Sequence, residues 1–392
     1  MIFLIAAEET AGVMMDNAQK ELVKLLKGSL FGMNVEPDEN VDWEAVIQEA
    51  RAQTVTALAA GAIEKEHSED WNQDVLRNIY GFMRVLQAQS DLIELFKTRE
   101  IPLVILKGTA AAMYYPVPER RAMGDIDFLV PQDRFDPALQ LMEDHGYRFI
   151  HQGPRHTELM KDGIEFELHR QFSRIDDSLT EGFDRREIAE IKGHAFPVLP
   201  KKENGLILLS HAAMHLQQGK LGLRQVIDWM MYVHCCLDDA AWYNGFQQLA
   251  AKYGLEKLAV TLTWLCREWL GLPGKITWCE EADPLLAEQL LDEVFKRGNF
   301  GRKLDKDRRL ETVVVSIRRL GFFHYLQHGG LYNWQASRKY PVLRPFAWAY
   351  QLCRWGKKGA GMIFRPRKMK DEMDTGRDLY SLNKQLGLYD SQ

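Results

Sequence analysis

Residues 101–131 read IPLVILKGTAAAMYYPVPERRAMGDIDFLVP, and the prediction of the fold is built outward from them. The apolar, β-branched run 101–106 predicts a strand, because such residues favour the pleated surface of a sheet. The strand ends at Lys107-Gly108-Thr109, and residues 110–115 then offer about two turns of good helix formers. After two prolines, residues 124–131 alternate and then run apolar, as a strand with one polar end does. The predicted order is strand, glycine turn, helix and strand.

A hairpin is predicted to follow. Beyond a helix expected over residues 134–145, strand-like runs cover 147–151 and 157–161, and Asp162-Gly163 ends the second run. Asp-Gly between alternating runs is a strong signal for a two-residue hairpin turn. The second arm, 164–169, places its apolar residues on one face and three polar residues on the other: Glu165, Glu167 and His169. We expect the apolar face to pack against helices.

Helical periodicity surrounds this mixed segment. Before it, helices are predicted over 18–27, 43–64 and 75–98, with Asp42 as the N-cap of the second. After it, the helical ranges are 204–239, 242–254, 256–270, 284–297 and 308–327. We therefore expect an α+β fold with three parts: an N-terminal helical segment (1–99), a small mixed β-sheet core (100–200) and a C-terminal helical region with a basic, aromatic tail (201–392).

The composition of the 392-residue chain is typical of a folded protein, with 46% hydrophobic and 27% charged residues. Its 55 acidic residues outnumber 50 basic ones and give a net charge of −5. This balance excludes a polycation that coats nucleic acid, so nucleic acid is not an expected partner. Five cysteines without CxxC spacing indicate neither a zinc site nor a disulfide scaffold, and they predict a reducing compartment.

Localisation is predicted from the apolar segments. Residues 1–9, MIFLIAAEE, hold an apolar run of seven residues with no basic residue before it and two glutamates after it. Such a run is too short and wrongly flanked for a signal peptide. No stretch approaches the ~20 uninterrupted apolar residues of a membrane span. We therefore expect a cytoplasmic protein without a transmembrane segment.

The acidic pair Asp125 and Asp127 has the clearest chemical meaning. Two residues apart on a strand, the side chains share a face, with ~6 to 7 Å between α-carbons. Carboxylates this close raise each other's pKa unless a cation lies between them. Mg²⁺ is the cation most used to bridge aspartates and phosphate oxygens, and Mn²⁺ is the alternative. Gly124, just before the pair, lets a ligand approach the backbone. Solvated charges at a strand end are the alternative interpretation of the pair taken alone.

A third carboxylate on a neighbouring strand would complete a site for two metal ions ~3.5 to 4 Å apart. Glu167 is the candidate, and Glu165 on the same face is the reserve. The turn at Lys107, Gly108 and Thr109 offers backbone N–H groups, an ammonium and a hydroxyl to a phosphate. It lacks the GxxxxGKS/T spacing of a Walker loop, and by itself it is typical of a tight turn. The turn and the acidic pair together predict a nucleotide site.

These motifs carry a resemblance to a known family. LKGTAAAMYYPVPERRAMGDIDFLVP at residues 106–131, followed by IEFELHRQF at 164–172, resembles the uncharacterised bacterial branch of the nucleotidyltransferase superfamily. That superfamily includes relatives of DNA polymerase β and the aminoglycoside and kanamycin nucleotidyltransferases. In the branch, a strand ending in LKG leads through a helix and a tyrosine-proline stretch to an arginine and GDIDxLV. An acidic residue two positions before a histidine comes later.

The resemblance implies a role for each matching residue. Gly108 and Thr109 would take the place of the superfamily's Gly-Ser or Gly-Gly turn on the nucleotide phosphates, with Lys107, Arg121 and Gly124 beside them. Three acidic residues would be catalytic and would hold Mg²⁺, and a histidine would end the strand: Asp125, Asp127, Glu167 and His169. The branch usually has proline after the arginine, whereas this chain has Ala122, which changes nothing chemical.

A looser resemblance extends into the C-terminal helices. His211 and His215 lie one helical turn apart in LLSHAAMHL, and Arg224 and Asp228 are likewise four apart in LRQVIDWMMYV. Both pairs match helices of the branch, and we place them, with His169, as candidate walls of the cleft. Histidines that merely pack between helices are the simpler interpretation of the first pair, since no third metal ligand is evident. An i,i+4 salt bridge is the equivalent interpretation of the second pair.

The last third of the chain carries a separate signal. Residues 338–370 contain ten Lys and Arg, no acidic residue and several interleaved aromatic residues. Such a segment suits an anionic acceptor, a nucleic acid or a membrane surface. A solvated basic surface over an aromatic core is the alternative, and the acidic balance of the whole chain favours it.

The expected activity is Mg²⁺-dependent transfer of a nucleoside monophosphate from a nucleoside triphosphate to an acceptor hydroxyl, with release of pyrophosphate. An alternative keeps the metal and transfers a sugar from a nucleotide sugar to a hydroxyl or phosphate. A second alternative is a non-catalytic nucleotide-binding regulator. The acceptor is open among a small molecule such as an antibiotic, a peptide, a polysaccharide precursor and another protein.

Overall fold

The computed structural model describes residues 15–34, 36–63, 69–153, 155–172, 175, 182–304, 309–359 and 366–389. Residues 1–9, which the sequence predicts not to be a signal peptide, lie outside this part of the chain. The described residues form two compact units, one within Met1–Leu216 and Lys220–Lys303, the other within Gln217–Gly219 and Leu304–Gln392. The larger unit contains the sheet. The predicted division at residues 99 and 200 stays a prediction.

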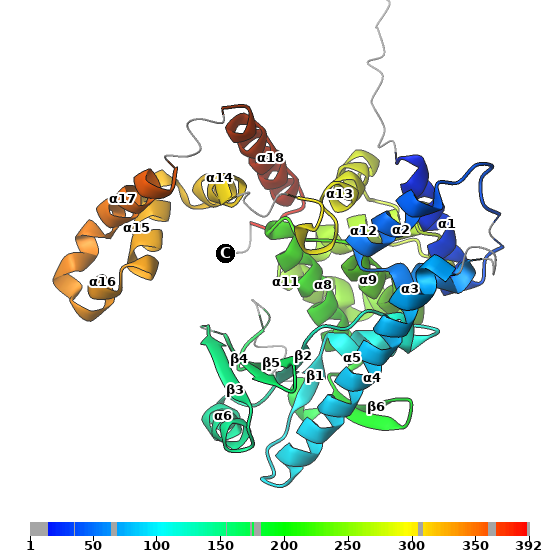
Figure 1. The fold of residues 1–392 in the computed structure, drawn as a ribbon, viewed down its shortest axis with the longest axis horizontal. Coiled ribbons are helices and arrows are strands. Elements are labelled where there is room, and N and C mark those ends of the chain that lie inside the picture. Colours follow the sequence, from blue (N-terminus) through cyan, green and yellow to red (C-terminus); the bar gives the residue numbers. More distant parts are fainter. Residues whose placement is uncertain are drawn as a thin grey trace, which may run out of the picture. The chain divides into compact units, whose positions relative to one another are not determined.

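The larger unit contains a seven-stranded mixed sheet, whose strands lie in the lower part of the view in Figure 1. Its strand order is β3-β4-β5-β2-β1-β7-β6. The strands are β1 (Val104–Leu106), β2 (Ile126–Leu129), β3 (Arg148–Gln152), β4 (His156–Lys161), β5 (Ile164–His169), β6 (Glu187–Ile191) and β7 (His194–Val198). The α+β class and the five strands predicted between residues 101 and 169 are confirmed. The β6–β7 hairpin was not predicted, although its Lys192-Gly193 turn has the positive φ angles of a tight hairpin turn.

The strand register brings two of the three predicted acidic residues, Asp127 and Glu167, together. β2 runs parallel to β5, and Asp127 lies directly opposite Glu167. β1 runs antiparallel to β2, with Leu106 opposite Asp127, so the glycine turn after β1 begins beside the acidic pair. Residues opposite one another on paired strands point to the same face of a sheet. Asp127 and Glu167 therefore share one face.

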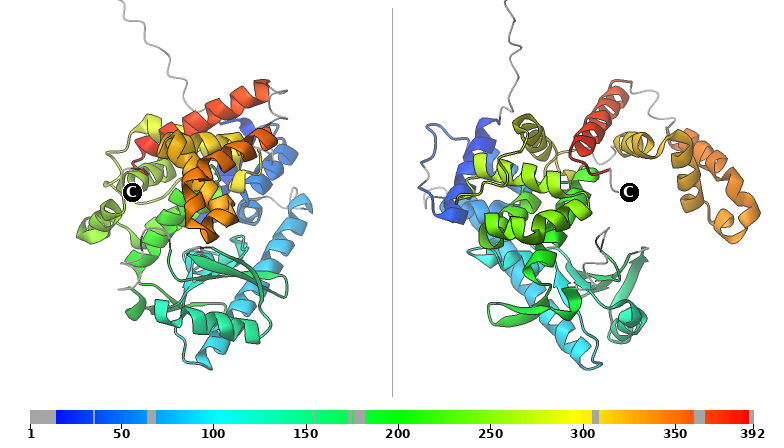
Figure 2. Two further views of the ribbon diagram at one scale, coloured as in Figure 1. Left: turned by 90° about the vertical axis from the view of Figure 1, so that its left-hand side faces the viewer. Right: turned by 180° about the vertical axis from the view of Figure 1, so that it is seen from behind.

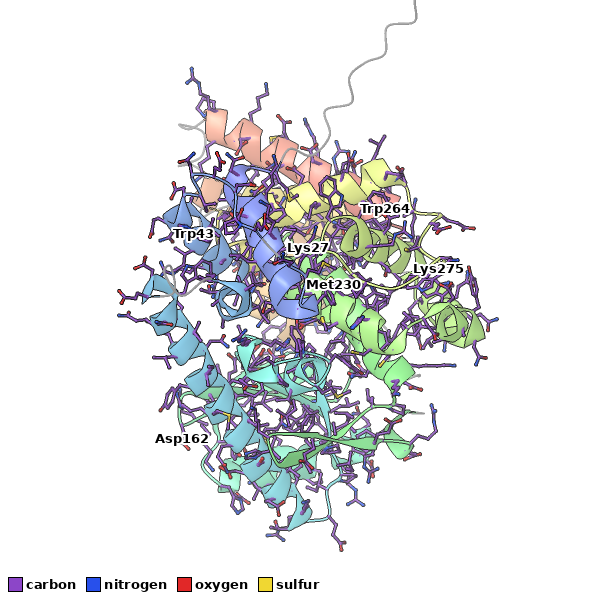
Figure 3. The ribbon with its side chains drawn as sticks, turned by 90° about the vertical axis from the view of Figure 1, so that its right-hand side faces the viewer. Lys27, Trp43, Asp162, Met230, Trp264 and Lys275 are labelled. Carbon is purple, nitrogen blue, oxygen red and sulfur yellow. The ribbon has the colours of Figure 1, made fainter. Side chains whose placement is uncertain are left out.

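The other face of the sheet is apolar and packs against α4 (Glu69–Lys97) and α6 (Phe135–Asp144). Phe96 of α4 meets Phe128 of β2 edge to face, with ring centroids 5.5 Å apart. The β4–β5 turn lies beside α4, where Arg84 donates to the carbonyl oxygen of Asp162 at 2.7 Å (Figure 3). Because side chains alternate along a strand, burying Ile126 and Phe128 on this side leaves Asp127 on the opposite side.

Helices complete the larger unit. The N-terminal ones are α1 (Asn17–Phe31), α2 (Trp43–Gln53) and α3 (Thr56–Ala59). Asp42 caps α2 as predicted, with its side chain accepting from the backbone of Ala45. The single helix predicted over 43–64 is wrong, because Thr54 adopts a left-handed conformation (φ 59°) and ends α2. Phe31 packs its ring against His234 at 5.3 Å, which joins α1 to a helix of the chain's middle third (Figure 2).

The remaining helices of this unit are α5 (Gly108–Ala112), α8 (Lys201–Gln217), α9 (Leu223–Cys236), α10 (Asp239–Ala241), the π-helical turn η5 (Trp242–Phe246), α11 (Gln247–Lys252), α12 (Glu256–Glu268) and α13 (Pro284–Arg297). Short 3₁₀ turns are η1 (Ala60–Ala62), η3 (Pro118–Arg120), η4 (Gln132–Arg134) and η6 (Asn299–Gly301). The helix predicted over 110–115 is the five-residue α5, and Gly245 (φ 108°) interrupts the one predicted over 242–254.

The smaller unit is helical. It contains α14 (Arg309–Leu320), α15 (Phe322–Asn333), α16 (Gln335–Lys339), the 3₁₀ turn η7 (Pro341–Phe346), α17 (Ala347–Gly359) and α18 (Pro366–Gln385). The continuous helix predicted over 308–327 is wrong, because Gly321 (φ 81°) breaks it between α14 and α15. No helix in the described part of the chain has the length and apolar character needed to cross a bilayer.

Candidate active site

Asp127 is the centre of a buried polar cluster on the sheet face opposite the apolar core. The side chain is 2% exposed, and its Oδ1 accepts a hydrogen bond from Lys107 Nζ at 2.5 Å. His169 Nε2 lies 2.9 Å from the same oxygen. Since an ionised carboxylate only accepts, the ring nitrogen is the donor. The three residues come from the ends of three adjacent strands, so the sheet itself positions them.

Glu167 extends the cluster. Its Oε2 lies 3.2 Å from His169 Nε2 and 4.0 Å from Lys107 Nζ. Burial raises the pKa of this carboxyl, but the hydrogen bond from His169 and the charge of Lys107 outweigh burial and lower the pKa to about 2. Asp127, Glu167 and His169 each offer one ligand atom, and these atoms all lie within 4.8 Å of one another. Two carboxylates and an imidazole at this spacing suit a divalent cation.

The carboxylates of the cluster also raise the pKa values of its two cationic members, Lys107 and His169. Burial lowers the pKa of Lys107, but the charges of Asp127, Glu167 and Asp125, in that order, raise it above its ordinary value. Burial also lowers the pKa of His169, and hydrogen bonds to Asp127 and Glu167 more than compensate. The carboxylates are thus strong enough to hold two buried positive charges.

Asp125 and Glu165 flank the cluster. Asp125 directly precedes β2 and is half-buried, and none of the described residues forms a hydrogen bond or ion pair with its carboxylate. Burial and then the charge of Glu167 raise the pKa of Glu165, which shares the face of Glu167 but is not among the three grouped ligands. The geometry therefore favours Glu167 over Glu165 as the third carboxylate.

The glycine turn lies against this acidic strand. A Cβ built on Gly108 (φ 33°) would lie 3.3 Å from Met123 Cε and 3.8 Å from the carbonyl oxygen of Asp125. Lys107 itself has φ 47°, a conformation that costs a non-glycine residue of order 1–3 kcal/mol and is concentrated at functional sites. Gly124 is exposed, with open space around its α-carbon. The backbone of the turn can therefore approach a ligand held by the acidic pair.

Thr109 differs from the prediction. Its side chain is fully buried, and its hydroxyl donates to Gln89 Oε1 of α4 at 2.6 Å. The hydroxyl is thus committed to the apolar side of the sheet and does not point to a phosphate. With α5 only five residues long, its dipole also contributes little. The backbone of the turn is what remains available to an anion.

Arg121 and Asp228 form a buried ion pair. Arg121 Nε and Nη2 donate to the two carboxylate oxygens of Asp228 at 2.6 and 2.7 Å. Tyr115 donates to Oδ1 at 2.6 Å, and burial followed by the Asp228 charge raises its pKa well above the ordinary value. The interpretation of Arg224 and Asp228 as an i,i+4 salt bridge is therefore wrong, because no ion pair joins these two described residues. Nucleotide contact by Arg121 stays a prediction, since Asp228 holds its guanidinium.

Replacing Asp228 with asparagine is expected to lower the free energy of unfolding by about 3–5 kcal/mol, because Arg121 is left as an unpaired buried charge. Urea unfolding measures the loss. Glu94→Gln serves as the control, since the exposed Lys97–Glu94 pair should be worth no more than about 1 kcal/mol. Equal losses in the two variants would contradict the structural role of the buried pair.

His211 and His215 pack against each other in α8. Their Nε2 atoms lie 2.7 Å apart and their rings meet edge to face at 4.3 Å. Burial and then the charge of Lys107 lower the pKa of His215 to about 3, and the same two causes lower that of His211 well below its ordinary value. Two neutral imidazoles are therefore held within the electrostatic reach of Lys107. Their predicted place in the cleft wall stays a prediction.

Protein stability is expected to fall as the pH drops from 6.5 towards 3. Over this range the unfolded state binds protons that the two buried histidines do not, at about 1.4 kcal/mol per pH unit and per histidine. Urea unfolding of the wild type and of His215→Gln at several pH values tests this. The variant should show the shallower slope, whereas His151→Gln on exposed β3 should not. Parallel slopes for all three proteins would refute it.

Arg224 lies near the acidic strand as well. Its Nη1 donates to the carbonyl oxygen of Ala122 at 3.3 Å, and its guanidinium stacks 5.2 Å from the ring centroid of Phe300. Within the described residues its Nε is buried without a hydrogen-bond partner. Burial and then the charge of Arg121 lower its pKa, while the charges of Asp228 and Asp125 raise it. Arg224 thus remains a buried cation close to Asp125.

A cavity of about 510 Å³ lies within the larger unit. It is bounded by α2, α3, α4 and the segment that carries Ala122 and Met123. The charged residues that line it are Arg51, Asp74, Arg77 and Arg302. Met123 lines the cavity and also faces Gly108, so this one residue adjoins both the cavity and the glycine turn.

Sequence patterns missed several members of the site. The Lys107–Asp127 bond and the central place of His169 depend on the register between β1, β2 and β5. The Gln89 and Tyr115 contacts join segments far apart in the sequence. Only the alternation of 164–169 placed His169 on the same face as Glu167.

Structural comparison gives distant likenesses. ANT(2")-Ia in complex with adenylyl-2"-tobramycin shares 11% identity over 43% of this chain and 95% of its own, with a TM-score of 0.32. The lincosamide antibiotic adenylyltransferase LnuA shares 18% identity over 36% of this chain and 90% of its own, with a TM-score of 0.27. An antigenic nucleotidyltransferase-like protein from Paracoccidioides brasiliensis shares 14% identity over 44% of this chain and 90% of its own, with a TM-score of 0.29. Likenesses at these scores carry no inference about this chain.

No curated protein sequence matches the chain. A family described as uncharacterised nucleotidyltransferase matches residues 39–271, which include the glycine turn, the acidic cluster and the helices α8 and α9. The match covers more than half of the 392 residues. The protein therefore belongs to the uncharacterised nucleotidyltransferase family.

Proposed function

We propose that this nucleotidyltransferase depends on a divalent cation and transfers a nucleoside monophosphate from a nucleoside triphosphate to an acceptor hydroxyl. The observation that carries the proposal is the cluster of Asp127 and Glu167 on paired strands, with Asp125 beside it and the Gly108 turn next to it. Family membership supports nucleotidyl transfer and does not support transfer of a sugar.

Asp125, Asp127 and Glu167 would hold the cation, with His169 beside them. The donor set fits Mg²⁺, which prefers carboxylate oxygens, and Mn²⁺, which also accepts imidazole. Lys107 now donates to the Asp127 oxygen that such a cation would use. We infer that Lys107 turns from Asp127 to the triphosphate when substrate binds. When bound, the cation neutralises the phosphates and acidifies the acceptor hydroxyl.

The protein's own residues would mainly position the reactants. The acceptor oxygen forms a bond to the α-phosphorus, the bond from that phosphorus to the bridging oxygen of the β-phosphate breaks, pyrophosphate leaves, and the hydroxyl proton passes to water. Glu167, with a pKa of about 2, is a weak proton acceptor, so we assign it to cation binding. Lys107 and the backbone at Gly108 would stabilise the charge of the leaving group.

The acceptor would come from the side of the helices that flank residues 100–200 within the larger unit. The cavity supports this assignment, because α2, α3 and α4 line it together with Met123, which also faces Gly108. Arg51 and Arg77 both pair with Asp74, and Arg302 is the third arginine of the lining. This net positive charge favours an acceptor with an anionic group. We assign residues 100–200 to the transfer chemistry and the flanking helices to acceptor binding.

The leaving product tests the reaction class. Incubation of the purified protein with each α-labelled nucleoside triphosphate, Mg²⁺ and cell extract should release pyrophosphate and label one acceptor. The label identifies the acceptor directly. Release of a nucleoside diphosphate, or label transfer that survives EDTA, would overturn the proposal.

A further inference from the structure

The segment 312–370 in the smaller unit has an extreme charge bias. It contains twelve Lys and Arg and no Asp or Glu, in a chain whose net charge is −5. The family match ends at residue 271, so the segment lies outside the part that family membership explains. A run of this length with one sign of charge is a patch for an anionic surface.

The helical hairpin made by α15, η7 and α17 exposes many large apolar side chains and buries few. Gly330 lets the two helices approach closely, because a Cβ there would overlap the backbone of Ala347. Of the described hydrophobic residues in 322–359, only Leu326 and Ala347 are fully buried. Large apolar side chains are exposed at Phe322, Phe323, Tyr332, Tyr340, Val342, Phe346, Trp348, Tyr350 and Leu352. Exposed apolar surface on this scale marks an interaction site.

Part of this surface is a continuous stripe. Trp348, Leu352 and Trp355 are spaced i, i+4 and i+7 on α17 and therefore share one helix face. Phe322 continues the stripe onto α15, since its ring lies 6.4 Å from that of Trp355 and 5.6 Å from that of Phe323. Phe323 is 74% exposed. Aromatic and aliphatic residues in one stripe, within a segment that has only basic charges, are the pattern of an interfacial helix pair.

We propose that the α15–α17 hairpin docks on the surface of a bilayer that contains anionic lipids. Basic residues would attract the headgroups, and the stripe would enter the boundary between headgroups and acyl chains. The exposed aliphatic residues Val342 (76%) and Leu352 (44%) separate this partner from nucleic acid, because they gain by burial in acyl chains and cannot stack on bases. The proposal is independent of nucleotidyl transfer.

Co-sedimentation of the full chain with vesicles tests the proposal. Binding should rise at least about tenfold from pure phosphatidylcholine to vesicles with 30% phosphatidylglycerol, and should fall as salt is raised. Phe323→Ser and Lys339→Glu, both at exposed positions, should each weaken binding several-fold. Leu76→Ser and Lys257→Glu are matched controls on exposed positions of the larger unit and should bind like the wild type.

Three results would overturn the proposal. One is no binding to anionic vesicles, and another is equal binding to neutral and anionic vesicles. The third is binding of single-stranded DNA that displaces the vesicles and is unaffected by Phe323→Ser, which would assign the basic segment to nucleic acid. Melting temperatures of all variants, compared with that of the wild type, separate lost binding from lost folding.

Discussion

Asparagine in place of Asp125 is expected to lower nucleotidyl transfer by on the order of 10³-fold and to leave the melting temperature close to that of the wild type. The carboxylate is half-buried beside the glycine turn and is free of hydrogen bonds and ion pairs among the described residues, so its loss would remove a proposed cation ligand and no structural contact. Losing one preorganised charge interaction at a reacting phosphate has effects of about this size. Pyrophosphate release under saturating triphosphate measures the change.

The matched control for this result lies on β5. Glu167→Gln should be as inactive as Asp125→Asn, whereas Glu165→Gln should stay within a few-fold of the wild type. Neither Asp125 nor Glu165 is among the three grouped ligands, but Asp125 borders the glycine turn, where its carbonyl oxygen lies 3.8 Å from a Cβ built on Gly108. Two results would contradict the proposed cation ligands. One is an Asp125→Asn protein with more than a tenth of the wild-type rate, and the other is loss of activity in Glu165→Gln alone.

Asn at position 127 should abolish transfer and also destabilise the larger unit by about 3–5 kcal/mol. Lys107 is 7% exposed and loses the nearer of its two carboxylate partners, keeping Glu167 at 4.0 Å, and removing one member of a buried pair is costly. Adding Lys107→Met should restore most of the stability, because neither charge is then left unpaired, but should not restore activity. Urea unfolding of the two single variants and the double variant gives the coupling energy.

Additive losses of stability would contradict this account. If Lys107→Met lowers the stability of the Asp127→Asn protein as much as that of the wild type, the two side chains are uncoupled. Stability that returns together with activity would show that Asp127 acts only through the fold.

Sequence patterns predicted the parts of the fold that depend on neighbouring residues. The alternation of 164–169 and the Asp162-Gly163 turn predicted β5 and its hairpin, and the strand after Gly124 predicted β2 with Asp127 on it, while Asp125 directly precedes that strand. Partners across the sheet or between distant helices were beyond such reasoning. Asp228 pairs with Arg121, 107 positions away, and not with Arg224 one turn away. Thr109 bonds Gln89 because α4 covers the apolar face, which no local pattern reveals.

Helix ends show the same limit. Apolar periodicity continues through Thr54 and Gly321, yet left-handed or positive φ angles there end one element and start another. The family match covers 39–271 and thus the cluster itself, while the basic hairpin of the smaller unit lies beyond it. The catalytic proposal and the membrane proposal therefore stand on different parts of the chain and fail separately.

Binding of Mn²⁺, followed by its electron paramagnetic resonance signal, tests the central proposal most directly. The wild type together with a non-hydrolysable nucleoside triphosphate should bind Mn²⁺ much more tightly than the protein alone or the nucleotide alone. In Asp125→Asn, adding the nucleotide should no longer raise the affinity for Mn²⁺ in this way. The proposal would be contradicted if the nucleotide bound as tightly in EDTA as with Mn²⁺, or if the wild type and Asp125→Asn bound Mn²⁺ with the same affinity.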